Sequence, residues 1–135
     1  MYDKIIDSGK KETFKTGYQR DSRIGKGRYD LLPMSALDRL ARHYENGANK
    51  YGDRNWELGA PLSRHVDSAL RHVSKWMRGS NDEDHLAAAA WNIFAILYTE
   101  EKILDGTLDR SLLEGLPSEL LKRYKQSLPK TNKKV

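Results

Sequence analysis

The residues of this chain that could do chemistry are concentrated in an alanine-rich stretch at positions 84–99. His85, Asn92 and Thr99 follow one another at intervals of seven residues, so on a helix they form a single polar line. Burying a polar group without a partner costs about 1–3 kcal/mol, so these side chains need either partners or a ligand. We predict that they line a pocket; the alternative is that His85 and Asn92 form hydrogen bonds to neighbouring helices.

Carboxylates precede this stretch and also occur on the segment before it. The acidic run 82–84 leads into His85, and Asp67 lies in the preceding apolar segment. Carboxylates from two adjacent helices can hold Mg²⁺ or Mn²⁺, which prefer oxygen ligands and leave room for substrate phosphates. The predicted metal ligands are Asp67, Asp84 and Glu83, with Glu45 as a further candidate. The alternatives are that the acids cap a helix and that Asp67 forms an ordinary surface pair with Arg71.

Histidines offer proton transfer, because the imidazole titrates near neutral pH. His72 and His85 are the predicted acid–base residues, and Asp84 joins them as a catalytic carboxylate. His65 and His72 lie seven residues apart on one predicted helix, but a histidine pair at this spacing is not a metal motif by itself.

Two glycine-containing segments carry bases suited to phosphates. In residues 25–30, glycines alternate with basic residues, so backbone amides and cations could approach an anion together. Residues 49–60 add cations, amides and the rings of Tyr51 and Trp56, which suit a nucleobase. The alternative for this loop is that both rings are anchored in the core. The predicted substrate-binding residues are Lys26, Arg28, Lys50, Tyr51, Arg54, Asn55, Trp56, Arg71 and Asn92.

A series of predicted helices positions these residues. Apolar residues recur at intervals of three and four, which is typical of amphipathic helices, and no strand alternation is visible. The sequence therefore predicts an all-α helical bundle with an irregular basic N-terminal arm and a flexible basic C-terminal tail. The expected segments are an arm at 1–32, a helical core at 33–104 with helices at 34–48, 61–77 and 84–104, a C-terminal helix at 105–128 whose helical part is 117–128, and a basic tail at 129–135.

The composition favours an intracellular protein with anionic partners. The chain has 135 residues, 32% of them charged, no cysteine and a formal net charge of +5. Disulfides and cysteine chemistry are therefore excluded, and anions are the favoured partners. Neither a signal peptide nor an apolar run of about 18 residues is visible, so we expect a cytoplasmic protein without membrane contact.

Four segments of the chain, taken in order, resemble a known family. They are residues 26–33 (KGRYDLLP), 47–56 (GANKYGDRNW), 67–72 (DSALRH) and 82–92 (DEDHLAAAAWN). The ordered set resembles the phage dATP/dGTP diphosphohydrolase N-terminal family, which is distantly similar to the all-α MazG-type nucleotide pyrophosphohydrolases. The resemblance covers about residues 25–101.

The resemblance implies metal-dependent cleavage of a purine deoxynucleoside triphosphate to the monophosphate and pyrophosphate, with Mg²⁺ or Mn²⁺ as cofactor. The chain departs from the MazG-type pattern, in which Glu-Glu-x-x-Glu on one helix and Glu-x-x-Asp on the next hold Mg²⁺, because its core has neither motif. Either the metal site is rebuilt from Asp67, Asp84 and the histidines, or the chain binds nucleotides without hydrolysing them.

The resulting prediction is a nucleotide pyrophosphohydrolase that forms a dimer or higher homo-oligomer, located in the host cytoplasm if the chain is phage-encoded. One alternative is a non-catalytic phage accessory protein that binds a nucleotide, or binds nucleic acid through its basic arm and tail. Another alternative is a helical adaptor whose polar line is simply satisfied core.

Overall fold

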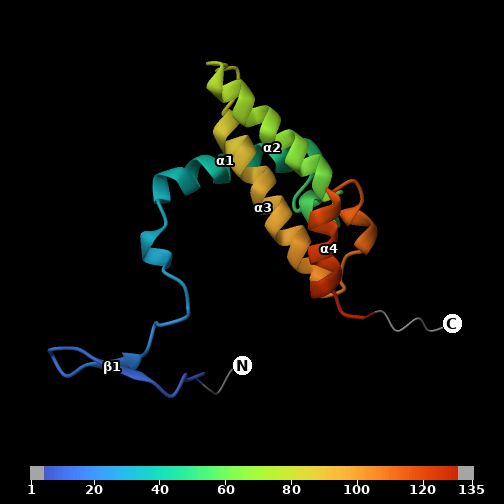
Figure 1. Cartoon of the computed structure of the whole chain (residues 1–135). Coiled ribbons are helices and arrows are strands. Elements are labelled where there is room, and N and C mark those ends of the chain that lie inside the picture. The colour runs from blue at the N-terminus through green and yellow to red at the C-terminus, as the bar shows by residue number, and fades with distance from the viewer. Residues whose placement is uncertain (1–4, 131–135) are drawn as a thin grey trace. The chain divides into compact units, whose positions relative to one another are not determined.

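The computed structural model describes residues 5–130 of the chain (Figure 1). The chain divides into two compact units, the first ending at Pro33 and the second beginning at Met34. Helices make up most of the second unit, so the predicted all-α class is confirmed. Most of the predicted basic tail at 129–135 lies outside the described residues.

The first unit contains a short hairpin that the sequence did not predict. Strand β1 (Lys11–Thr13) pairs antiparallel with β2 (Gln19–Asp21). Each strand has three residues and carries polar side chains on both faces, so no apolar alternation marks it. In the turn, Gly17 donates its N–H to the Phe14 carbonyl over 2.9 Å, and its φ of +88° suits glycine. A 3₁₀ turn, η1 (Tyr29–Leu31), follows.

The second unit holds the α-helices of the described chain, and none of them is long and apolar enough to cross a membrane. Their bounds are α1 (Met34–Tyr51), α2 (Leu62–Met77), α3 (His85–Leu104) and α4 (Ser118–Ser127), with 3₁₀ turns η2 (Asn55–Leu58) and η3 (Arg110–Leu113). The predicted helices are confirmed, although α1 ends at Tyr51 instead of residue 48. It stops there because Gly52, with φ +93°, closes the last turn by donating to the Ala48 carbonyl over 2.8 Å.

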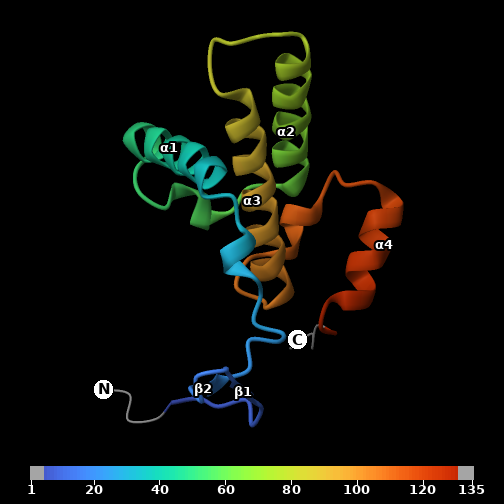
Figure 2. The ribbon, with the colours of Figure 1, turned by 90° about the vertical axis from the view of Figure 1, so that its left-hand side faces the viewer.

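The α2–α3 pair forms the centre of the second unit (Figure 2). His65 lies opposite Asn92 and His72 opposite His85, so the two helices run antiparallel. Alanines line the α3 side of this contact, and Ala88 is fully buried. The small alanine side chains let α2 and α3 approach closely. Helix α1 and the turn η2 also pack against α3.

A hydrophobic cluster lies at the end of this pair where α2 begins and α3 ends. Its buried residues are Leu62, Ile103, Leu113, Leu116 and Tyr124. They come from α2, α3, η3, α4 and the segment between the last two, so the cluster joins the C-terminal elements to the central pair. Burial of each large apolar side chain stabilises the fold by about 1.5–3 kcal/mol.

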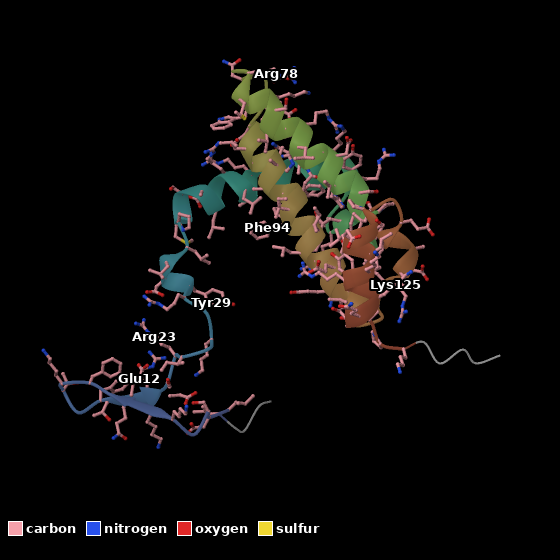
Figure 3. All side chains as sticks on the ribbon, viewed as in Figure 1. Glu12, Arg23, Tyr29, Arg78, Phe94 and Lys125 are labelled. Carbon is pink, nitrogen blue, oxygen red and sulfur yellow. The ribbon has the colours of Figure 1, made fainter. Side chains whose placement is uncertain are left out.

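The apolar stripe predicted for α2 is only partly buried. Leu62 and Ala69 are buried, but Leu70 is 65% exposed. On α3, Ile93 and Leu97 are also exposed. So is the neighbouring Phe94, which Figure 3 labels. Because the two helices are antiparallel, their exposed stripes fall on the same side of the pair. We call this surface the apolar face; its residues are Val66, Leu70, Val73, Met77, Ile93 and Leu97.

Candidate functional site

The polar line of α3 is buried, with His85, Asn92 and Thr99 between 1% and 5% exposed. The Asn92 amide is used within the chain: Nδ2 donates to a backbone carbonyl one turn earlier and to Ser68 Oγ, and Oδ1 lies 3.0 Å from His65 Nδ1. Asn92 therefore connects α3 to α2 by hydrogen bonds, which is the alternative to a pocket that the sequence left open. The two pockets of the second unit described below are lined by other residues, so contact between Asn92 and a substrate stays a prediction.

At the start of the polar line, His85 meets His72 of α2 and Glu83 of the α2–α3 turn. The two Nδ1 atoms are 2.9 Å apart, and Glu83 Oε1 lies 3.4 Å from His72 Nδ1 and 3.8 Å from His85 Nδ1. We call these residues the histidine–glutamate cluster. Their ligand atoms all lie within 4.8 Å of one another, which is compatible with a divalent metal ion.

The hydrogen bond of His85 to Asp82 and the burial of His72 decide how these two rings face the cluster. His85 Nε2 donates to Asp82 Oδ1 over 2.7 Å, and this bond lowers the pKa of Asp82. With its proton on Nε2, His85 presents an unprotonated Nδ1 to the cluster. Burial lowers the pKa of His72 below its ordinary value, which favours the form of this ring that keeps a nitrogen lone pair.

Asp84 caps α3 and binds an arginine of α1. Its Oδ1 accepts the Ala87 N–H over 3.1 Å, and its two oxygens accept from the Arg39 guanidinium over 2.7 and 2.9 Å. This guanidinium lowers the pKa of Asp84 to about 2. Both carboxylate oxygens are engaged, so the structure shows the helix-capping alternative for Asp84.

Asp67 lies apart from these groups. It is exposed on α2 and accepts a hydrogen bond from Arg71 over 2.6 Å. His72, which faces α3, is five residues further on, or about 7.5 Å along the helix axis. The metal-ligand group found within residues 5–130 includes neither Asp67 nor Glu45. The predicted Asp67–Asp84 metal pair is not formed, because each carboxylate binds an arginine instead.

A cleft between α1 and the start of α3 is lined by two arginines of α1 and two carboxylates that precede α3. It encloses about 370 Å³ and is lined by Arg39, Arg42, His43, Asn46, Glu83, Asp84 and Ala87. The four α1 residues share one helix face because of their spacing of three and four. Asp84 holds Arg39 in place, so its guanidinium is already oriented. We call this cleft the arginine pocket.

A second hollow, which we call the aromatic pocket, lies beside it. It encloses about 180 Å³ and is lined by His43, Tyr44, Gly47, Ala48, Tyr51, Gly52, Arg54, Asn55, Trp56 and Trp91. The Trp56 ring is held edge-on by Tyr44 and Tyr98, with ring centroids 5.9 and 4.8 Å away. His43 lines both pockets, so they are direct neighbours.

A sequence model described as dATP/dGTP diphosphohydrolase, N-terminal, matches residues 16–107. The chain belongs to this family. The matched range includes every residue of both pockets and of the histidine–glutamate cluster. The expected family is thus confirmed, and its description places the chain in a group named for nucleotide hydrolases. No curated protein and no solved structure matches the chain.

The predicted substrate-binding residues of this dATP/dGTP diphosphohydrolase family member divide into two groups. Tyr51, Arg54, Asn55 and Trp56 line the aromatic pocket, and Lys50 lies 5.2 Å from the centre of the Tyr51 ring. The other predicted cations form ion pairs, the first two within the first unit and the third on the exposed side of α2. These pairs are Lys26–Asp21, Arg28–Asp30 and Arg71–Asp67.

The sequence interpretation missed the α1 side of the site. Arg39, Arg42, His43 and Asn46 alternate with the apolar stripe of α1, and such a polar face is ordinarily solvated. One feature of the sequence could have indicated this site. Two arginines, a histidine and an asparagine within eight residues share one helix face, and together they form a compact anion-binding surface. The sequence could not indicate that Asp84 is the ion-pair partner of Arg39, because the two residues lie 45 positions apart.

Proposed function

We propose that this chain hydrolyses a purine deoxynucleoside triphosphate to the monophosphate and pyrophosphate. The observation that carries the proposal is the continuity of the site. The aromatic and arginine pockets share His43, and the arginine pocket shares Glu83 with the histidine–glutamate cluster. A surface for a base, a surface for phosphates and a cluster of metal-ligand atoms therefore follow one another, in the order that a nucleotide requires.

The aromatic pocket suits the base. Tyr51 stands at its rim, 63% exposed, and Trp56 is fixed by its ring contacts. Stacking of a base on such a ring contributes about 1–3 kcal/mol. Asn55 adds a paired donor and acceptor, which suit the polar edge of a purine.

The arginine pocket suits the phosphates. Arg42 presents a planar guanidinium group, which matches phosphate oxygens in a bidentate manner. Arg39 adds the N–H groups that its ion pair with Asp84 does not use. Cleavage to the monophosphate requires that water attack the α-phosphorus while the α–β bridging oxygen leaves with pyrophosphate. The two guanidiniums stabilise the charge that develops on the leaving pyrophosphate.

Proton transfer is the task that we assign to His43. The sequence favoured His72 and His85, but these two rings bind each other and adjoin Glu83, so they suit ion binding better. The His43 imidazole lines both pockets and can take the proton of the attacking water. When bound, a divalent metal ion would further neutralise the phosphates.

The donor atoms decide which divalent ion fits. Mg²⁺ prefers a nearly complete shell of oxygen ligands, whereas Asp67 and Asp84 are occupied by arginines. The oxygen cage expected for Mg²⁺ is therefore not formed within the described residues. The histidine–glutamate cluster instead offers two nitrogens and one carboxylate, which suit a transition metal.

The test is release of pyrophosphate and phosphate from a panel of dNTPs and NTPs, with each divalent metal and with EDTA. We expect pyrophosphate from dATP and dGTP in preference to pyrimidine nucleotides, and a loss of at least tenfold in Arg42→Gln. The matched control is Arg71→Gln, on the exposed side of α2, which should keep wild-type turnover. Absence of release from every nucleotide would contradict the proposal; if purine nucleotides still raised the Tm, the chain would be a binding protein without hydrolysis.

We further propose that a second copy of the chain covers the apolar face. Helix α3 is apolar on nearly every side, which is typical of a helix in a protein interior, yet Ile93 and Leu97 are exposed. The α2 stripe on the same side has helical spacing and no charge. A two-fold contact would place this face against its own copy, so that α2 and α3 of both copies form a four-helix bundle.

A further inference from the structure

We propose that His72, Glu83 and His85 bind a divalent transition-metal ion such as Zn²⁺ or Co²⁺ in preference to Mg²⁺. The ligands come from α2, the α2–α3 turn and the first residue of α3. Ion binding itself stands on this geometry alone. Use of the ion in catalysis rests on the proposed function, because Glu83 also lines the arginine pocket.

The separations of the ligand atoms match those around a single ion. Donors about 2.1 Å from an ion and roughly 90–110° apart are separated by about 3.0–3.4 Å. The observed separations are 2.9 Å between the two Nδ1 atoms, and 3.4 and 3.8 Å from Glu83 Oε1 to His72 and His85. Modest side-chain rotation therefore brings all three atoms onto one ion.

Without an ion, the same nitrogens form a hydrogen bond. The two imidazole centroids are 5.2 Å apart, so the Nδ1 atoms face each other. The His72 Nδ1–H is the donor, since the proton of His85 is on Nε2 and bound to Asp82. On ion binding, the His72 proton would move to its own Nε2, so that both Nδ1 lone pairs and Glu83 Oε1 could point at the ion.

The surroundings of His85 are those of a preorganised metal ligand. Metal-binding histidines typically donate their second ring N–H to a carboxylate, which fixes the ring and its tautomer. His85 does this through Asp82 over 2.7 Å, and its side chain is only 1% exposed. Glu83 is 51% exposed, so the solvent side of the ion is open to water or a phosphate oxygen.

The donor set determines the preference between metals. Two imidazole nitrogens with one carboxylate suit the borderline ions, and the affinity of such sites rises from Mn²⁺ through Co²⁺ and Ni²⁺. Mg²⁺ loses its water shell reluctantly and gains little from nitrogen ligands. We therefore expect Zn²⁺ and Co²⁺ to bind at least tenfold more tightly than Mg²⁺.

The experiment is titration of the full chain with Co²⁺, followed by visible absorption, and with Zn²⁺ and Mg²⁺, followed by calorimetry. The wild type should bind one equivalent of Co²⁺ or Zn²⁺, and His72→Gln and Glu83→Gln should lower the affinity at least tenfold. Asp82→Asn should weaken binding by about 10- to 100-fold. The matched control is Asp67→Asn, an exposed carboxylate on α2, which should change nothing. X-ray absorption of the Zn²⁺-loaded wild type should show imidazole ligands without the need for a variant.

Failure of the wild type to bind Co²⁺ and Zn²⁺, or equal binding by all variants, would overturn the proposal and leave a structural histidine pair. Metal binding as expected, without hydrolysis of any nucleotide, would uphold the site and reject the proposed function. Hydrolysis that survives in His72→Gln after metal binding is lost would reject the catalytic use of the ion.

Discussion

His43 is the residue at which the two pockets meet. Its ring lies 5.7 Å from that of Trp91, and it lines the aromatic pocket on one side and the arginine pocket on the other. A single imidazole thus adjoins both the proposed base and the proposed phosphates. We therefore expect individual side chains to set the orientation of the nucleotide, with its base toward Trp56 and its phosphates toward Arg42.

Tyr124 gives the fold a measurable dependence on alkaline pH. Burial, together with its hydrogen bond to Glu100, raises the pKa of Tyr124 from 10.0 to about 12. Below pH 10 the phenol is neutral in both the folded and the unfolded chain, so its contribution to stability is complete. Between pH 10 and about 12 only the unfolded chain ionises, so the stabilisation is lost as the pH rises.

We therefore expect the free energy of unfolding of the wild type to fall by about 2 kcal/mol relative to Tyr124→Phe over that range. Denaturant unfolding of both proteins between pH 9 and pH 12 measures the difference. Parallel pH profiles would show that Tyr124 ionises in the folded state as readily as in the unfolded chain.

Among the secondary structure elements, α3 organises the site. Its first turn carries His85 and is capped by Asp84, its middle contacts α2 through Asn92, and its Trp91 closes the aromatic pocket. The cap also fixes Arg39 of α1, so the start of one helix orients the phosphate-binding face of another.

Substitution of Asp84 separates capping from catalysis. Asp84→Ala removes the cap and the ion pair, so we expect the free energy of unfolding to fall by about 1–2 kcal/mol. Asp84→Asn keeps a good capping residue and should lower the free energy of unfolding less.

Because Asp84 positions Arg39, we expect Asp84→Asn to raise the KM for a dNTP more than it lowers kcat. Complete loss of kcat in a folded Asp84→Asn would instead support the catalytic role first predicted from the sequence.

The helices could be predicted from the sequence because their apolar periodicity and their glycine and proline boundaries are local signals. The hairpin at Lys11–Thr13 and Gln19–Asp21 could not, since its strands are short, polar and held by backbone hydrogen bonds. The aromatic half of the site could be predicted from the residue types at positions 51–56. The arginine half depends on how α1 packs against α3, and on ion pairs between distant positions, which no local pattern encodes.

Contacts between distant positions also explain why the metal ligands predicted from the sequence differ from the cluster in the structure. Asp67 and Asp84 are suitable ligands by residue type, but each is neutralised by an arginine. The spacing of seven residues disfavoured His65 and His72 as metal ligands, and His72 and His85 were predicted as acid–base residues instead. They converge with Glu83 because α2 and α3 are antiparallel and place the two rings opposite each other.

For the molecule as a whole, the apolar face predicts self-association. Introducing a carboxylate into a buried apolar contact is strongly unfavourable, so Leu70→Glu and Leu97→Glu should convert a dimer to a monomer. Analytical ultracentrifugation at several concentrations measures this. The matched control is Leu31→Glu, because Leu31 of the first unit is 67% exposed and Leu70 is 65% exposed. A wild type that remains monomeric at all concentrations would contradict the proposed dimer.

The central claim is that one nucleotide occupies both pockets, and calorimetric binding of its fragments tests this most directly. In EDTA, dATP, deoxyadenosine and inorganic triphosphate are titrated into the wild type, Tyr51→Ala and Arg42→Gln, with Tyr18→Ala as a control of equal exposure. Tyr51→Ala should weaken dATP and deoxyadenosine by about 5- to 150-fold and leave triphosphate unchanged. Arg42→Gln should weaken dATP and triphosphate and leave deoxyadenosine unchanged. Equal effects of both variants on all three ligands, or no effect on any, would contradict the account.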